Sequence, residues 1–112
     1  MKKYKMHKLN DFTSTVGQRL FDPNTTKSQL LTEPIIVASW GAYNWGFFKN
    51  DHLIFKVNGA LHKGFVVIIL EWEDLYKVYL LDENIRQTVP SIGGIYADSL
   101  VEVIDNLVET PR

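Results

Sequence analysis

The sequence lacks cysteine entirely, and it lacks any apolar run long enough to form a membrane-spanning helix. The absence of cysteine excludes disulfides, thiol chemistry and thiolate-bound metals. The longest apolar run, Phe65 to Leu70, has the length of a strand. The basic start of the chain, Met1 to Lys5, is not followed by an apolar segment. We therefore expect no secretory signal, a cytoplasmic location and no membrane partner.

The composition is that of a folded domain. Of the 112 residues, 46% are hydrophobic and 22% are charged, a balance that argues against intrinsic disorder. This length fits one domain with its own apolar core. We therefore expect residues 1–112 to form a single α+β domain, in which residues 1–8 are a flexible basic arm.

The formal net charge of −1 conceals an uneven distribution of charge. Residues 1–70 carry nine Lys/Arg and four Asp/Glu, which makes them +5, whereas residues 71–112 carry three and nine, which makes them −6. This separation would allow one copy of the chain to attract another. The arm contains four candidate anion contacts: Lys2, Lys3, Lys5 and Lys8. A solvated terminus is the preferred interpretation of the arm, since DNA-binding arms normally accompany a basic domain.

Before Pro34 the sequence predicts irregular helical structure. Apolar residues recur there at helical spacing: Leu9, Phe12, Val16 and Leu20. Residues 25–32 are expected to form a short helix with Asn24 as its cap.

From Ile35 onward the sequence predicts strands, because β-branched and aromatic residues alternate with turn signals. Strands are expected at residues 35–40, 45–49, 53–57, 60–72, 75–81 and 85–89. The C-terminal helix has the clearest pattern, an apolar stripe at 3.6-residue spacing formed by Leu100, Val103, Ile104, Leu107 and Val108. Ser99 and Glu102 fit a capping box at its start. We therefore predict an α+β fold, in which an antiparallel β-meander of four to six strands carries a packed C-terminal helix and follows a short irregular helical N-terminus. A small curled β-barrel plus a helix is the alternative.

Asn58-Gly59 lies between two apolar runs and predicts a β-hairpin with a two-residue type I′ turn. This turn would place Val57 opposite Ala60. Because side chains alternate along strands, one sheet face would collect Leu53, Phe55, Val57, Val66 and Ile68. The other face would collect Ile54, Phe65, Val67 and Ile69.

The two histidines near this hairpin would point to opposite faces, so a shared metal ion is not expected. His52 is expected in solvent, and His62 is expected to be a hydrogen-bonded structural residue. The standard catalytic and phosphate-binding motifs are missing from the sequence. Their absence favours a non-enzymatic protein. No catalytic, cofactor-binding or metal-binding residue and no cofactor is predicted.

An aromatic segment gives the strongest functional indication. Five of the fourteen aromatic residues lie between Trp40 and Phe48. Exposed Tyr and Trp are typical interface anchors, and the candidate interaction surface consists of Tyr43, Trp45, Phe47 and Lys49. The competing interpretation places these rings in the core. At the end of the strand expected over residues 60–72, Glu71 and Glu73 should keep the strand end soluble, and Trp72 is expected to pair across strands.

The predicted function is a small non-enzymatic module for protein interaction or self-association, so the expected partner is another protein or a second copy of the chain. The first alternative is a nucleic-acid-binding accessory protein that uses the basic arm and exposed aromatic residues. The second alternative is a small-ligand-binding domain.

Overall fold

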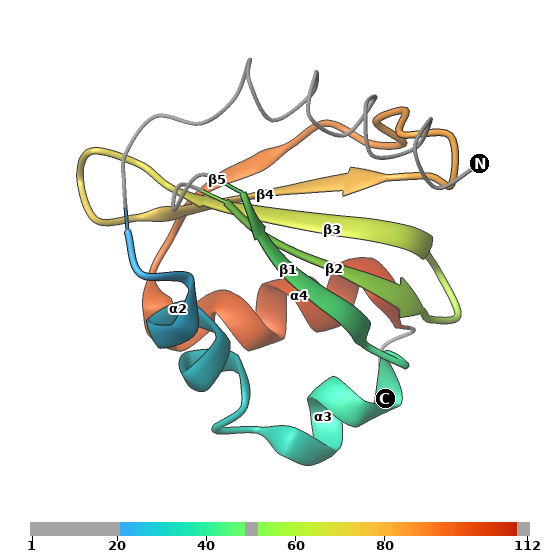
Figure 1. Ribbon diagram of the computed structural model, residues 1–112, viewed down its shortest axis with the longest axis horizontal. Coiled ribbons are helices and arrows are strands. Elements are labelled where there is room, and N and C mark those ends of the chain that lie inside the picture. The colour runs from blue at the N-terminus through green and yellow to red at the C-terminus, as the bar shows by residue number, and fades with distance from the viewer. Residues whose placement is uncertain (1–20, 49–51, 110–112) are drawn as a thin grey trace.

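The computed structural model describes residues 21–48 and 52–109, which form an open antiparallel sheet with helices on one face (Figure 1). In this described part of the chain, five strands follow one another in meander order: β1 (Tyr43–Phe48), β2 (His52–Asn58), β3 (Lys63–Leu70), β4 (Tyr76–Leu81) and β5 (Ile92–Ile95). The helices are α2 (Pro23–Leu30), α3 (Pro34–Ser39), the single 3₁₀ turn η1 (Ala97–Ser99) and α4 (Leu100–Val108). The predicted meander with a C-terminal helix is confirmed. The barrel alternative is wrong, because β1 and β5 form opposite edges of a sheet that does not close.

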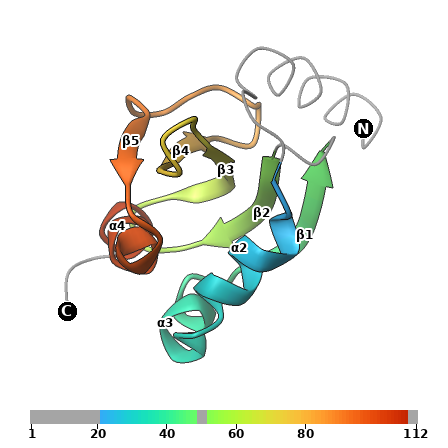
Figure 2. The ribbon, with the colours of Figure 1, turned by 90° about the vertical axis from the view of Figure 1, so that its left-hand side faces the viewer.

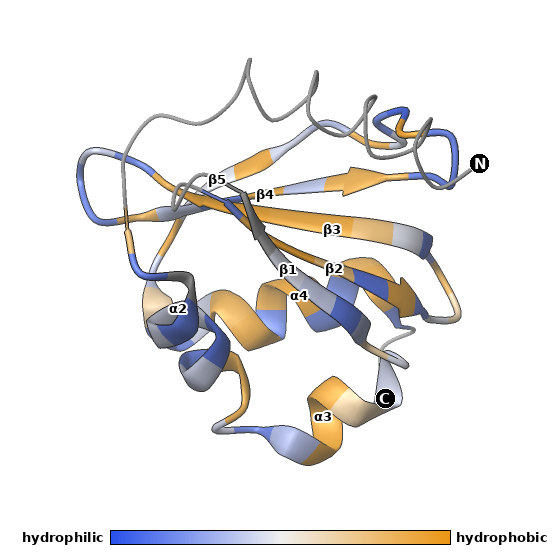
Figure 3. Ribbon diagram, in the orientation of Figure 1, coloured by the Kyte–Doolittle hydropathy of each residue, from blue (hydrophilic) through white to orange (hydrophobic). Residues whose placement is uncertain are grey.

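Helices α2, α3 and α4 lie together under one face of the sheet (Figures 1 and 2). Their apolar side chains and those of the strands form the main core, which includes Leu30, Val37, Trp40, Phe55, Ile68, Leu100 and Ile104. The opposite face holds a second buried cluster: Ile54, Phe65, Val67, Ile69, Tyr79 and Leu81. Because β3 is buried on both faces, it is apolar along most of its length (Figure 3). The predicted helix near residues 9–20 and the basic arm lie outside the described residues.

The prediction of a strand over residues 35–40 is wrong, because Pro34–Ser39 form α3. Proline suits the first position of a helix, since its φ is preset and its missing N–H would have no partner there. Val37 and Trp40 are one helical turn apart and both are buried. Burial of this face outweighs the preference of β-branched residues for strands.

Helix α2 begins two residues earlier than predicted, and its cap is Asp22 rather than Asn24. The Asp22 carboxylate accepts a hydrogen bond of 3.0 Å from the backbone N–H of Asn24. A buried hydrogen bond of 2.9 Å between the hydroxyl groups of Thr26 and Tyr76 then joins α2 to β4. In the described part of the chain, no helix has the length and apolar character needed to cross a bilayer.

The β2–β3 connection is longer than predicted. Asn58 pairs with Lys63 and Val57 pairs with Gly64, so residues 59–62 form the loop and the two-residue turn is wrong. The partner of Val57 is four residues later than predicted. Because four is an even number, each side chain keeps its predicted face, and the two predicted faces match the two buried clusters.

Contact with α4 explains the longer loop. The backbone N–H of Leu61 donates a hydrogen bond of 2.8 Å to the carbonyl of Val108 at the end of α4. The N–H of Ala60 donates one of 2.9 Å to Glu109 Oε1. A Cβ at Gly59 would overlap the Val108 carbonyl, so only glycine fits against the helix. The loop therefore satisfies the end of a helix that lies far away in the sequence.

The predicted C-terminal helix is confirmed as α4, which buries Leu100, Val101, Ile104 and Val108. The predicted capping box is wrong, because the Ser99 side chain makes no capping hydrogen bond and η1 leads directly into the helix. The last strand lies at Ile92–Ile95 rather than at residues 85–89. Gln87 forms only an isolated bridge, to Leu81.

Candidate interaction surface

Two predicted interface anchors lie in β1, at one edge of the sheet. Tyr43 is 44% exposed, whereas Trp45 is half-buried. The Trp45 ring stacks on Phe55 with 4.3 Å between ring centroids. Lys27 Nζ lies over the Trp45 ring, 5.0 Å from its centroid. Trp45 thus packs against the main core, which leaves Tyr43 as the more exposed ring.

An irregularity in β1 separates these two rings. The pairing with β2 shifts between Tyr43 and Gly46, and Asn44 has a φ of 54°. Tyr43 lies near the ammonium of Lys56, whereas Trp45 contacts Phe55, whose side chain points to the other face.

Of the remaining predicted contact residues, the structure describes the backbone position of Phe47. Phe47 lies in β1, where its backbone pairs with Leu53. The other predicted contacts lie outside the described residues: Lys49, Lys2, Lys3, Lys5 and Lys8.

The structure describes two of the three histidines, His52 and His62. His52 is fully buried, so the expectation of a solvated side chain is wrong. His62 is buried, and its Nε2 lies 3.1 Å from the carbonyl oxygen of Phe65, which confirms a hydrogen-bonded structural histidine. Across residues 21–48 and 52–109, no group of three potential ligands is arranged to hold a metal ion.

Lys56, on the second face of the sheet, forms a partly exposed ion pair with Glu83. Lys56 Nζ lies 3.2 Å from Glu83 Oε2 and over the rings of Tyr43 and Phe65, at 5.6 and 5.3 Å from their centroids. Burial lowers the pKa of Lys56, but the hydrogen bonds and electrostatic attraction of Glu83 and, to a smaller extent, Tyr43 outweigh it, so the pKa is raised above 10.5. The contacts of this ammonium are those of a structural ion pair.

The opposite edge of the sheet presents a surface that the sequence did not indicate. Strand β5 forms this edge, with Ile92 37% exposed and the following Tyr96 67% exposed. Because Ile95 pairs with Tyr76 at the start of β4, the end of β5 lies beside the β3–β4 turn. In that turn Trp72 is 72% exposed, so its predicted pairing across strands is wrong.

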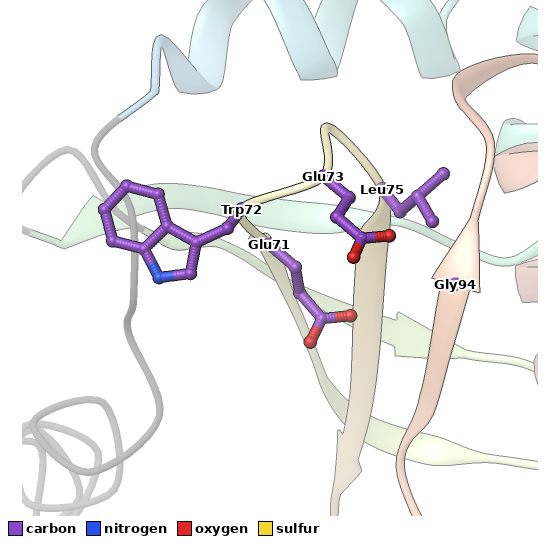
Figure 4. A pocket seen from close by; sticks show the side chains of 5 residues that line it. All are labelled: Glu71, Trp72, Glu73, Leu75 and Gly94. Atoms are coloured by element: carbon purple, nitrogen blue, oxygen red, sulfur yellow. The ribbon is translucent and has the colours of Figure 1, made fainter.

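A pocket of about 360 Å³ lies between this turn and β5 (Figure 4). It is lined by Glu71, Trp72, Glu73, Leu75 and Gly94. The two carboxylates extend toward the same side, while the Trp72 indole extends away from Gly94. We give the name β5 edge surface to the half-buried Glu71 together with five exposed residues of this turn and edge: Trp72, Glu73, Ile92, Gly94 and Tyr96.

The missing side chain of Gly93 leaves room for the Glu71 carboxylate beside the edge strand. A Cβ on Gly93 would lie 3.0 Å from Glu71 Oε1 and 3.7 Å from the Lys77 side chain. The Glu71 carboxylate therefore reaches past β4 to the backbone of β5. The ammonium of Lys77 lies over the ring of Tyr79, 5.4 Å from its centroid.

No protein-family model matches the chain, and comparison with curated proteins and with solved structures gives no significant match. The sequence signal for this turn was a tryptophan between two glutamates, but the approach of the turn to β5 depends on strand pairing that local patterns do not reveal.

Proposed function

We propose that this protein is a non-enzymatic interaction module that binds an extended segment of a partner protein along β5. The supporting observation is an edge strand bordered by large exposed apolar side chains, Ile92 and Tyr96, and by the exposed Trp72 of the adjacent turn. An edge strand offers backbone N–H and C=O groups to an added strand. Tyrosine and tryptophan are the residues that most often contribute large shares of binding energy at interfaces.

The geometry favours β5 over the aromatic segment that the sequence indicated. At the β1 edge, Trp45 is half-buried and stacks on Phe55, so this ring packs against the core. Both edge strands pair irregularly with their neighbours, so the exposed side chains, rather than the regularity of pairing, favour β5. At β5, Gly93 and Gly94 are exposed and carry no side chain that would obstruct an approaching backbone.

The test begins with a display selection of short extended peptides on the full chain, followed by affinity measurements on two matched variants. A lysine on an edge strand opposes strand addition, so Ile92→Lys should weaken the selected peptides at least about tenfold. Ile35 lies on α3 and is 85% exposed, so Ile35→Lys adds the same charge elsewhere and should leave the affinities unchanged. Selected peptides that bind wild type and Ile92→Lys equally, or a selection without binders, would contradict the proposal.

A further inference from the structure

We infer that the segment bound at the β5 edge surface is basic, and that its lysine or arginine pairs with Glu71 and Glu73. The inference rests on the proposed function, since it names the chemistry of the partner at that same surface.

The two carboxylates are available for such a pair. Both line the pocket beside β5 and extend to the same side of the β3–β4 turn (Figure 4). Within residues 21–48 and 52–109, neither carboxylate forms an ion pair. The Lys77 ammonium lies over the Tyr79 ring and forms no ion pair with either carboxylate.

The position of Glu71 relative to β5 brings it within reach of an added strand. Its Oε1 lies 3.0 Å from the position that a Cβ on Gly93 would take, beside the edge strand. Opposed side chains on neighbouring strands have Cβ atoms about 5 Å apart. A lysine or arginine opposite Gly93, with its side chain on the same face as Glu71, therefore reaches that carboxylate.

Charge complementarity favours a basic partner over a second copy of the same edge. The β3–β4 turn, residues 71–75, carries three acidic side chains, Glu71, Glu73 and Asp74, and no basic one. Two such edges brought together would repel each other. A basic segment would instead be attracted, and the attraction would weaken with salt.

The test compares three extended peptides of equal length, in which valine alternates with lysine, serine or glutamate. Fluorescence anisotropy with the full chain gives each affinity. We expect the lysine peptide to bind about fivefold to tenfold tighter than the serine peptide, and the glutamate peptide to bind weakest. Glu71→Gln combined with Glu73→Gln should abolish the preference for lysine over serine. Glu33→Gln combined with Glu102→Gln removes two exposed carboxylates elsewhere and should preserve that preference.

The outcomes separate the inference from the function on which it rests. If lysine and serine peptides bind equally while Ile92→Lys weakens both, edge binding stands and the basic partner is wrong. If the two double variants lose the lysine preference equally, the attraction is non-specific and the inference is also wrong. If no peptide binds, or if Ile92→Lys leaves all three affinities unchanged, the proposed function fails and the inference fails with it.

Discussion

Trp40 Nε1 donates a hydrogen bond of 2.9 Å to Asp105 Oδ1, and this bond joins the end of α3 to α4. Trp40 is fully buried, and its ring lies parallel to that of Phe55 with 6.3 Å between centroids. The bond therefore satisfies the single polar atom of the largest buried side chain in the main core. It also gives α3, which is only six residues long, a specific attachment beneath the sheet.

Removing the acceptor of this bond should destabilise the fold. Asp105→Ala leaves the Trp40 N–H buried without its acceptor, which costs about 1–3 kcal/mol of the free energy of unfolding. Asp105→Asn retains a carbonyl oxygen at that position and should cost less. Chemical denaturation of both variants checks this expectation, and equal losses would show that the hydrogen bond is not the cause.

The close approach of the β2–β3 loop to α4 predicts a second stability effect. Gly59→Ala introduces a Cβ that would overlap the Val108 carbonyl, so we expect a loss of about 1–3 kcal/mol in the free energy of unfolding. Gly46→Ala is the matched control, because a Cβ there meets nothing within 4 Å. Urea titration should show a lower midpoint for Gly59→Ala alone. A wild-type midpoint for that variant would contradict the packing of the loop on the helix.

The Lys56–Glu83 pair predicts a pH effect with a definite sign. The pKa of Lys56 lies above 10.5 in the folded protein, so the pair stabilises the fold below about pH 10.5 and loses its effect as the pH rises through the folded-state pKa. The difference in free energy of unfolding between wild type and Glu83→Gln should therefore shrink in alkaline solution. Glu102→Gln changes an exposed carboxylate and should show a difference that hardly varies with pH. A constant difference for Glu83→Gln would mean that the pair does not stabilise the fold.

The two aromatic residues of β1 should differ in their effect on stability. Trp45→Ala removes a ring that stacks on Phe55 and should cost about 2 kcal/mol of the free energy of unfolding. Tyr43→Ala removes a more exposed ring and should cost about 1 kcal/mol or less. Thermal unfolding of both variants measures the contrast. A larger loss for Tyr43→Ala would reverse our assignment of Trp45 to the core.

The parts of the fold that follow from local pattern were predictable. Strand β3 is a continuous apolar run, and α4 carries a regular apolar stripe, so both could be located from spacing alone. Helix α3 could not, because residues 35–40 favour a strand locally and become helical through the burial of Val37 and Trp40. The β2–β3 loop was mispredicted because its length depends on Val108, far away in the sequence.

The β5 edge surface was hidden from sequence reasoning for the same reason. Ile92–Ile95 contains two glycines and lacks the alternation that predicts a strand. Its proximity to Glu71 follows from the pairing of β4 with β5 and from the missing side chain of Gly93. Local sequence patterns indicate neither the pairing of β4 with β5 nor the approach of Glu71 to Gly93.

Residue-resolved amide hydrogen exchange of the full chain, with and without a selected peptide, tests the central claim most directly. If a partner segment adds to the edge strand, its new hydrogen bonds will slow exchange of backbone amides within Ile92–Ile95, while amides of Tyr43–Phe48 at the opposite edge keep their rates. Protection of the β1 edge alone, or unchanged exchange at β5 when the peptide is bound, would contradict the assignment of binding to this edge.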